Sequence, residues 1–213
     1  MSKMKELKKI IVNKPLKLDC GETINNYPIA YETYGKLNEK KDNAILAFHA
    51  LTGDQFLTGI NPVTNKKGWW TYLIGPSKPI DTNKFFVICA NVIGGCMGSF
   101  GPSTVDEKSK KPLGTNFPVI TINDMVNAQY NLLDHFKIKK LFCVIGGSMG
   151  GMQVLQFVSN FPNAAKNAIP IACTANHSAQ NIAFNELARQ SIMADNNWDK
   201  GNYVNKEKSP DKG

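Results

Sequence analysis

The chain has 213 residues, 42% of them hydrophobic and 20% charged, which is the balance of a water-soluble globular protein with one sizeable core. Its five cysteines show no C-x-x-C spacing, so we expect no zinc site, no disulfide framework and a reducing, cytoplasmic location. The formal net charge of +8 comes from scattered lysine groups without a nucleic-acid-binding motif, and no apolar run approaches a membrane span. We therefore expect neither nucleic acid nor a membrane as a partner.

The N-terminal half of the chain predicts a lead-in followed by strands. Residues 1–15 are basic and predict a loosely tied lead-in. Residues 16–34 alternate apolar and polar side chains around a glycine and an asparagine pair, which predicts an antiparallel hairpin. Nearly continuous apolar runs at 43–49 and 85–91 predict buried strands. Between these two runs, residues 53–82 are rich in Gly, Pro and Asn and predict a long functional loop.

The C-terminal half alternates helices with strands. The helix predicted over 121–136 opens on a threonine with an aspartate three residues later, a variant of the capping box. Apolar runs at 141–145 and 168–173 predict two more buried strands, and a helix is expected over 149–161 between them. A last helix is expected over 178–193. The alternation indicates an α/β fold, with a mostly parallel sheet covered by helices on both faces.

The most informative motif is G-x-S-x-G at 146–150, with Ser148 at its centre. The predicted strand ends at the first glycine, and the predicted helix begins just beyond the serine. This arrangement makes a tight strand-to-helix turn, in which the serine backbone is strained and its hydroxyl projects from the top of the sheet. In this context the motif predicts a nucleophilic serine.

A nucleophilic serine needs a base and an acid, and the sequence does not supply them in the expected order. On this type of fold, the acid and then the histidine follow the serine along the chain. His49 and His135 precede Ser148, and no Asp or Glu lies between Ser148 and His177. We interpret His49, at the end of a predicted strand, as a structural residue. The acid and base of the triad are therefore not identified in this sequence.

Two backbone N–H groups are predicted to stabilise the oxyanion that forms when Ser148 attacks an acyl group. One belongs to the residue after the nucleophile, which is Met149. The other comes from the loop after the earlier central strand, where Leu51 is the best-placed residue.

Arg189 is the only arginine among the 25 basic residues. A guanidinium binds a carboxylate through two parallel hydrogen bonds, a geometry that lysine cannot reproduce. The alternative is a residue that remains by chance on a helix surface. Composition alone favours neither interpretation.

Several separated segments resemble, in the same order, the N-terminal part of the homoserine O-acetyltransferase family, which has the α/β-hydrolase fold. The segments are 31–35, 49–53, 68–70, 91–99, 146–153 and 185–192. The resemblance extends from about residue 16 to the last residue. One departure is Phe100, where the family often has threonine, and it affects loop packing rather than chemistry.

The resemblance implies a two-step acetyl transfer. Ser148 would attack the thioester of acetyl-CoA, release CoA and hold the acetyl group as an ester, which the hydroxyl of L-homoserine would then attack. Leu51 and Met149 would be the oxyanion donors, and Arg189 would bind the carboxylate of the amino acid. No resident cofactor and no metal are expected.

The resemblance also divides the chain. Residues 16–177 would form an incomplete α/β-hydrolase core, and residues 178–213 would begin a helical lid, through which the full-length enzyme is expected to form a homodimer. The family places its triad aspartate and histidine on later strands. We therefore expect the chain to lack the last strands of the sheet, and to be poorly soluble and inactive alone.

Four alternatives stay open. On the same scaffold, the acceptor can be L-serine, as in a serine O-acetyltransferase, or the donor can be succinyl-CoA, as in a homoserine O-succinyltransferase. A serine esterase would use water in place of the amino acid. A non-catalytic remnant would act only as a binding module.

Overall fold

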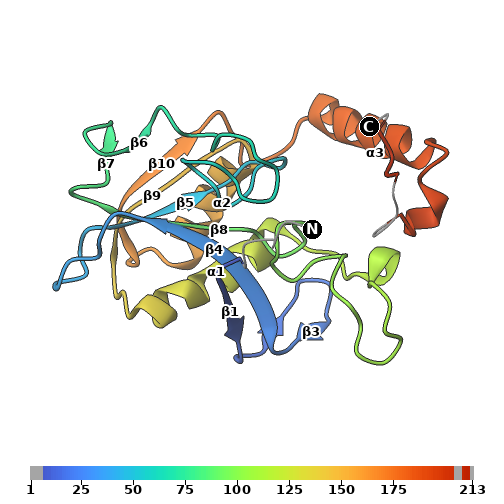
Figure 1. Ribbon diagram of the computed structural model, residues 1–213, viewed down its shortest axis with the longest axis horizontal. Coiled ribbons are helices and arrows are strands. Elements are labelled where there is room, and N and C mark those ends of the chain that lie inside the picture. Colours follow the sequence, from blue (N-terminus) through green and yellow to red (C-terminus); the bar gives the residue numbers. More distant parts are fainter. Residues whose placement is uncertain (1–6, 204–207, 212–213) are drawn as a thin grey trace.

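The computed structural model describes residues 7–203 and 208–211 and has a six-stranded sheet at its centre (Figure 1). The strand order is β1-β4-β8-β5-β9-β10. The strands β8, β5, β9 and β10 are parallel, whereas β4 is antiparallel to both β1 and β8. The bounds are β1 Lys9–Val12, β4 Tyr27–Tyr34, β5 Ala44–Phe48, β8 Phe86–Ala90, β9 Leu141–Gly147 and β10 Ala165–Ile171. The mostly parallel sheet predicted from the sequence is confirmed.

The N-terminal segment is more ordered than its sequence indicates. Lys9–Val12 forms β1, which pairs along its whole length with β4, so the prediction of a loose lead-in is wrong for these residues. The reason is that Val12 packs into the main core. The predicted hairpin is reduced to β2, Leu16–Lys17, and β3, Thr23–Ile24, because β4 joins the central sheet instead.

Two helices, α1 (Ile122–Phe136) and α2 (Met149–Asn160), cover one face of the sheet. The capping box at the start of α1 is present, since the Thr121 side chain accepts the Asp124 N–H and the Asp124 side chain accepts the Thr121 N–H. A short 3-10 helix, η1, precedes α1 at Gly114–Asn116. The core on this side joins apolar side chains from the sheet and both helices: Leu46, Phe48, Ile88, Val144, Leu132, Val154 and Phe157.

The opposite face of the sheet is covered by an irregular segment in place of helices. Leu57, Trp69, Trp70 and Ile74 of this segment pack on the sheet residues Ile45, Ala47, Val87, Cys143 and Ile145. The segment contains only two short strands, β6 (Ile74–Gly75) and β7 (Ile80–Asp81). Within the described residues, the prediction of helices on both faces therefore holds for one face only. The long loop predicted over residues 53–82 covers the apolar side chains on the second face of the sheet.

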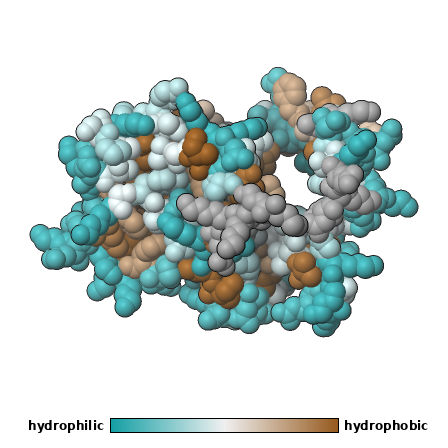
Figure 2. Space-filling model, viewed as in Figure 1, coloured by the Kyte–Doolittle hydropathy of each residue, from teal (hydrophilic) through white to brown (hydrophobic). Residues whose placement is uncertain are grey.

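The last strand and the last long helix are exposed. Six of the seven residues of β10 are exposed, so the prediction that this strand is buried is wrong, because β10 pairs only with β9 among the described strands. The helix α3, Ala179–Met193, has no buried residue and lies apart from the sheet in Figure 1. Figure 2 shows hydrophobic side chains on the surface of this region, at upper right. A 3-10 helix, η2 (Asp199–Gly201), follows α3.

Three further observations bear on the sequence-based expectations. No helix in the described part of the chain is long and apolar enough to cross a membrane. All five cysteines are free, and only Cys89 and Cys143 are buried, although the apolar run at 168–173 suggested a third. Within residues 7–203 and 208–211, no group of three side chains is arranged to hold a metal ion.

Candidate active site

Ser148 occupies the turn between β9 and α2 and is exposed to solvent. Its backbone has φ 55° and ψ −123°, a conformation that is strained for a residue with a side chain. The Ser148 N–H donates a hydrogen bond of 3.0 Å to the carbonyl oxygen of Ile171, at the end of β10. The strained turn predicted from the motif is therefore present, and the neighbouring strand holds it in place.

The glycines of the motif allow the helix to approach the sheet. A Cβ atom on Gly150 would lie 2.2 Å from the carbonyl oxygen of Phe48, at the end of β5. A Cβ atom on Gly146 would lie 2.4 Å from the carbonyl oxygen of Gly150. At Gly147, by contrast, no atom lies within 4 Å of an added Cβ. The first two positions therefore require glycine for close packing, and the third does not.

The predicted oxyanion donors lie at the same edge of the sheet. Phe48 of β5 and Gly146 of β9 are partners in a parallel pair, so the chain segments that follow them leave the sheet side by side. Leu51 follows Phe48 by three residues, and Met149 follows Gly146 by three. Within the described chain, neither backbone N–H donates a hydrogen bond to another part of the fold. Their role as oxyanion donors remains a prediction.

His49 fixes the start of the loop that carries Leu51. Its Nδ1 lies 2.7 Å from the carbonyl oxygen of Ala50, and its Nε2 accepts the Val92 N–H at 3.1 Å. These contacts place the proton of the neutral ring on Nδ1. Burial lowers the pKa of His49, which favours this neutral form. The structural role that we inferred for His49 is confirmed, because both ring nitrogens are engaged in the fold.

Two residues that the sequence analysis did not single out hold the far end of this loop. The Tyr34 hydroxyl accepts the Leu57 N–H at 2.9 Å and donates to the Gln55 carbonyl oxygen at 3.2 Å. The Asp54 carboxylate accepts the Phe56 N–H at 2.8 Å. Burial raises the pKa of Tyr34, so the phenol stays protonated and able to donate. Their position within or next to the family-like segments 31–35 and 49–53 was the only sequence signal for either residue.

None of the three histidines hydrogen-bonds to Ser148 in the described structure. His135 contacts the Tyr31 hydroxyl, with its Nε2 at 3.4 Å, and His177 lies in the segment after β10. Arg189 lies on α3, where its Nε donates to the Glu186 carboxylate at 3.0 Å and its side chain is 60% exposed. The structure thus brings Leu51, Met149 and Ser148 to one edge of the sheet and leaves Arg189 on a separate helix. The carboxylate-binding role of Arg189 remains a prediction.

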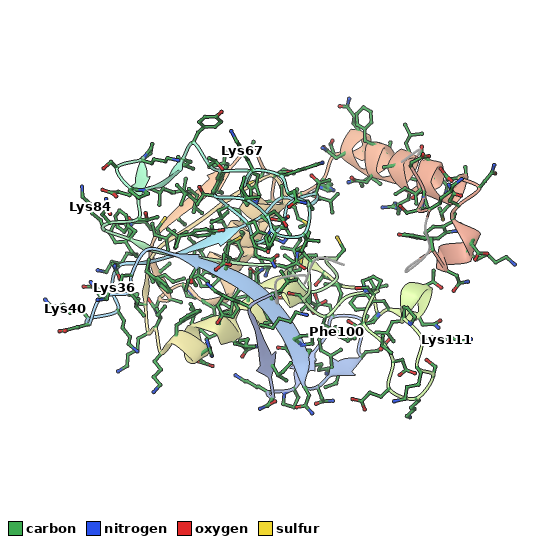
Figure 3. The ribbon with its side chains drawn as sticks, viewed as in Figure 1. Lys36, Lys40, Lys67, Lys84, Phe100 and Lys111 are labelled. Atoms are coloured by element: carbon green, nitrogen blue, oxygen red, sulfur yellow. The ribbon has the colours of Figure 1, made fainter. Side chains whose placement is uncertain are left out.

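A pocket of about 370 Å³ borders the loop after β5. Ala50 and Gly53 line it on the loop side, and Lys66 and Lys67 line it on the side of the irregular segment. Figure 3 shows Lys67 apart from Lys36, Lys40 and Lys84, which lie toward the left, and from Lys111 at lower right. These five labelled lysines therefore do not gather in one patch, and Lys66 and Lys67 are the two lysines that line this pocket.

The mostly parallel sheet and the strained serine after β9 are the features of the α/β-hydrolase fold. The sequence profile of the α/β-hydrolase fold family matches residues 43–212, and the chain belongs to this family. The chain is 72% identical over 207 residues to the homoserine O-acetyltransferase of Pelagibacter ubique (strain HTCC1062), covering 97% of this chain and 56% of the relative. It is 58% identical over 201 residues to that of Mesorhizobium japonicum, covering 94% and 52%. The chain spans about half the length of the curated relatives it matches.

Solved structures of two activities resemble the chain. A homoserine O-acetyltransferase from Bacillus anthracis superposes with a TM-score of 0.86 at 29% identity, covering 97% of this chain and 57% of that one. Esterase E22 superposes with a TM-score of 0.83 at 33% identity, covering 93% and 55%. An acetylester hydrolase from Corynebacterium glutamicum gives 0.78 at 32% identity, covering 93% and 53%. The fold is therefore shared by transferases and esterases.

Proposed function

We propose that this chain carries the nucleophile of an enzyme that transfers an acetyl group from acetyl-CoA to the hydroxyl of L-homoserine. The observation that carries the proposal is the strained, exposed Ser148, set between β9 and α2 in a chain 72% identical to a homoserine O-acetyltransferase. A cytoplasmic location, a role in methionine biosynthesis and a homodimer belong to the same proposal.

The proposed reaction has two steps. Ser148 Oγ attacks the thioester carbonyl while a base takes its proton, and the C–S bond breaks to release CoA, whose sulfur receives that proton. The hydroxyl oxygen of L-homoserine then attacks the acetyl ester, and its proton passes through the base to Ser148 Oγ as the ester bond breaks and frees the Ser148 hydroxyl. In both steps the carbonyl oxygen becomes negatively charged, and the N–H groups of Leu51 and Met149 would stabilise it.

The charges of the site agree with anionic substrates. Lys66 and Lys67 form no ion pair among the described residues, and they line the pocket beside the loop after β5 together with one carboxylate, that of Asp54. Their positive potential would attract the phosphates of acetyl-CoA. Arg189 would bind the carboxylate of L-homoserine, after exchanging its present partner Glu186 for the substrate.

A hybrid enzyme tests this proposal. In the hybrid, this chain replaces the matching segment of the Pelagibacter ubique relative. Release of CoA is measured with acetyl-CoA or succinyl-CoA as the donor, and with L-homoserine, L-serine or water as the acceptor. We expect the hybrid to prefer acetyl-CoA with L-homoserine, the Ser148→Ala variant to lose activity by at least about 1,000-fold, and the chain alone to show no turnover. Transfer that survives in Ser148→Ala, or a preference for another pair, would contradict the proposal.

An esterase is the second candidate, because esterase E22 and the acetylester hydrolase share this fold at similar TM-scores. Arg189 separates the two candidates, since water has no carboxylate to bind. In a transferase, Arg189→Lys removes the two-pronged contact and lowers transfer to L-homoserine strongly, while slow hydrolysis of the acetyl ester continues. Hydrolysis of the acetyl ester at the same rate in Arg189→Lys and the parent, with no transfer to L-homoserine in either, would favour the esterase.

A further inference from the structure

Gln153 is a fully buried amide close to the candidate nucleophile. It lies on α2, five residues after Ser148, and has 0% exposure. A glutamine in such a place must find partners for its N–H and C=O groups, because a buried polar group without them costs about 1–3 kcal/mol. The hydrogen-bond partners of the Gln153 amide therefore indicate its role.

The Gln153 amide nitrogen faces both segments that carry the predicted oxyanion donors. Its Nε2 donates at 3.3 Å to the carbonyl oxygen of His49, which lies two residues before Leu51. The same nitrogen lies 3.4 Å from the carbonyl oxygen of Met149, in the first turn of α2. One side-chain NH₂ group therefore connects the loop after β5 with the helix start after Ser148.

A second glutamine sets the orientation of this amide. Gln129 of α1, which is 1% exposed, donates from Nε2 to the Gln153 Oε1 at 2.7 Å. An amide that accepts from Gln129 must turn its NH₂ group in the opposite direction, toward His49. The Gln129 Oε1 itself has no hydrogen-bond partner within the described residues. A pair of apolar side chains would avoid this unpaired oxygen, so packing alone does not account for the two glutamines.

We propose that Gln153 is a positioning residue, whose amide sets the spacing between the two backbone N–H groups predicted to bind the oxyanion. The proposal rests on the proposed function. Gln153 does not contact the acyl group. It acts through the peptide units of His49 and Met149, and Gln129 acts through Gln153.

The first experiment measures amide hydrogen exchange in the 213-residue chain. Gln153→Met keeps the length and removes the two hydrogen bonds that the amide donates and the one that it accepts from Gln129. Gln156→Met is the control on the same helix, where the amide bonds to Asn160 at 2.7 Å. The Gly53 N–H, bonded to the Ala50 carbonyl oxygen at 2.9 Å, reports on the loop after β5, which carries Leu51. We expect this amide to exchange at least about ten-fold faster in Gln153→Met and unchanged in Gln156→Met. Equal acceleration of amides in β5 and β8 would indicate global loosening and overturn the proposal.

The second experiment measures kinetics in the hybrid enzyme. We expect Gln153→Met to lower kcat by about 10- to 100-fold, because a misplaced oxyanion donor acts on the transition state. The KM for acetyl-CoA should stay within about three-fold, since Gln153 does not touch the substrate. Gln129→Met should have a smaller effect in the same direction. Unchanged kcat in Gln153→Met, or equal loss in Gln156→Met, would overturn the proposal.

Replacing Gln153 with glutamate gives a pH-dependent readout, which a change in packing alone would not produce. A protonated carboxyl can donate to His49 while it accepts from Gln129, whereas an ionised carboxylate cannot donate. Burial would raise the pKa of the introduced carboxyl. The ratio of Gln153→Glu activity to parent activity should therefore rise as the pH falls, and a flat ratio would count against positioning. If the unsubstituted hybrid transfers no acetyl group, the proposed function fails, while the exchange measurement still decides the positioning role.

Discussion

The strands β9 and β10 lie side by side in the sheet, yet six of seven residues of β10 are exposed and most of β9 is buried. Ile145 of β9 and Ile169 of β10 are register partners, with exposures of 5% and 46%. The helices that follow differ in the same way, because α2 buries part of its surface and α3 buries none. An apolar run thus predicts a strand, whereas its neighbours decide whether the strand is buried.

The exposed elements, β10 and α3, have the features of a binding surface. Among the described strands, β10 lies at the edge of the sheet, and its exposed residues Ile169 and Ile171 are apolar. Phe184 and Leu187 of α3 are more than 60% exposed. Open edges and exposed apolar side chains favour association with further protein. The buried pair, β9 with α2, instead holds the candidate nucleophile on a rigid support.

The largest expected difference between the two regions comes from the paired isoleucines. Ile145→Ala should lower the free energy of unfolding by about 2–5 kcal/mol, because it leaves a cavity in a packed core. Ile169→Ala, its register partner, should cost less, about 1 kcal/mol, since Ile169 is already 46% exposed to solvent. Urea unfolding of the chain measures both values. Equal losses would show that β10 is covered in solution.

The next largest effect is expected at the turn itself. Gly150→Ala should destabilise the chain by about 1–3 kcal/mol, because the new methyl group would collide with the carbonyl oxygen of Phe48. Gly147→Ala is the matched control, since nothing lies within 4 Å of its added Cβ. Thermal unfolding compares the two variants. A Tm for Gly150→Ala as high as that of Gly147→Ala would mean that α2 packs less closely on β5 than the structure shows.

His49 should make the stability of the buried region depend on pH. Burial lowers its pKa in the folded protein, so the unfolded chain binds the proton more readily. The stabilisation is complete above the ordinary pKa of about 6.5 and is lost as the pH falls below it, by up to about 1.4 kcal/mol per pH unit. Urea unfolding between pH 7 and pH 5 measures this loss. His49→Gln should reduce this slope, and a slope equal to that of the parent chain would contradict the prediction.

The smallest expected effect compares the two helix caps. Thr121→Ala should cost about 1 kcal/mol, because α1 is packed on the core and its first turn loses a side-chain partner. Ser178 caps α3 in the same way, accepting the Asn181 N–H at 3.3 Å. Since α3 buries no residue, Ser178→Ala should reduce helicity by circular dichroism without changing the main unfolding transition. A shift of that transition would show that α3 docks on the core.

Local chemistry made much of the fold and part of the site predictable. The G-x-S-x-G spacing predicted the strained backbone of Ser148, and the threonine before α1 predicted its capping box. β1 was missed because its apolar run is short and follows lysines, and only pairing with β4 makes it a strand. Tyr34 was missed because its partners Gln55 and Leu57 lie more than 20 residues away in the chain.

The sequence by itself determined the alternation of strands and helices, the position of the strained serine and the resemblance to an acyltransferase family. These follow from periodicity, glycine spacing and motif order, which are local properties. Only the tertiary structure decided that β10 and α3 are exposed and that the His49 ring holds the start of the loop after β5. It also decided that the Gln153 amide donates to the carbonyl oxygen of His49. Each of these depends on contacts between segments far apart in the chain, such as the 104 residues that separate His49 from Gln153.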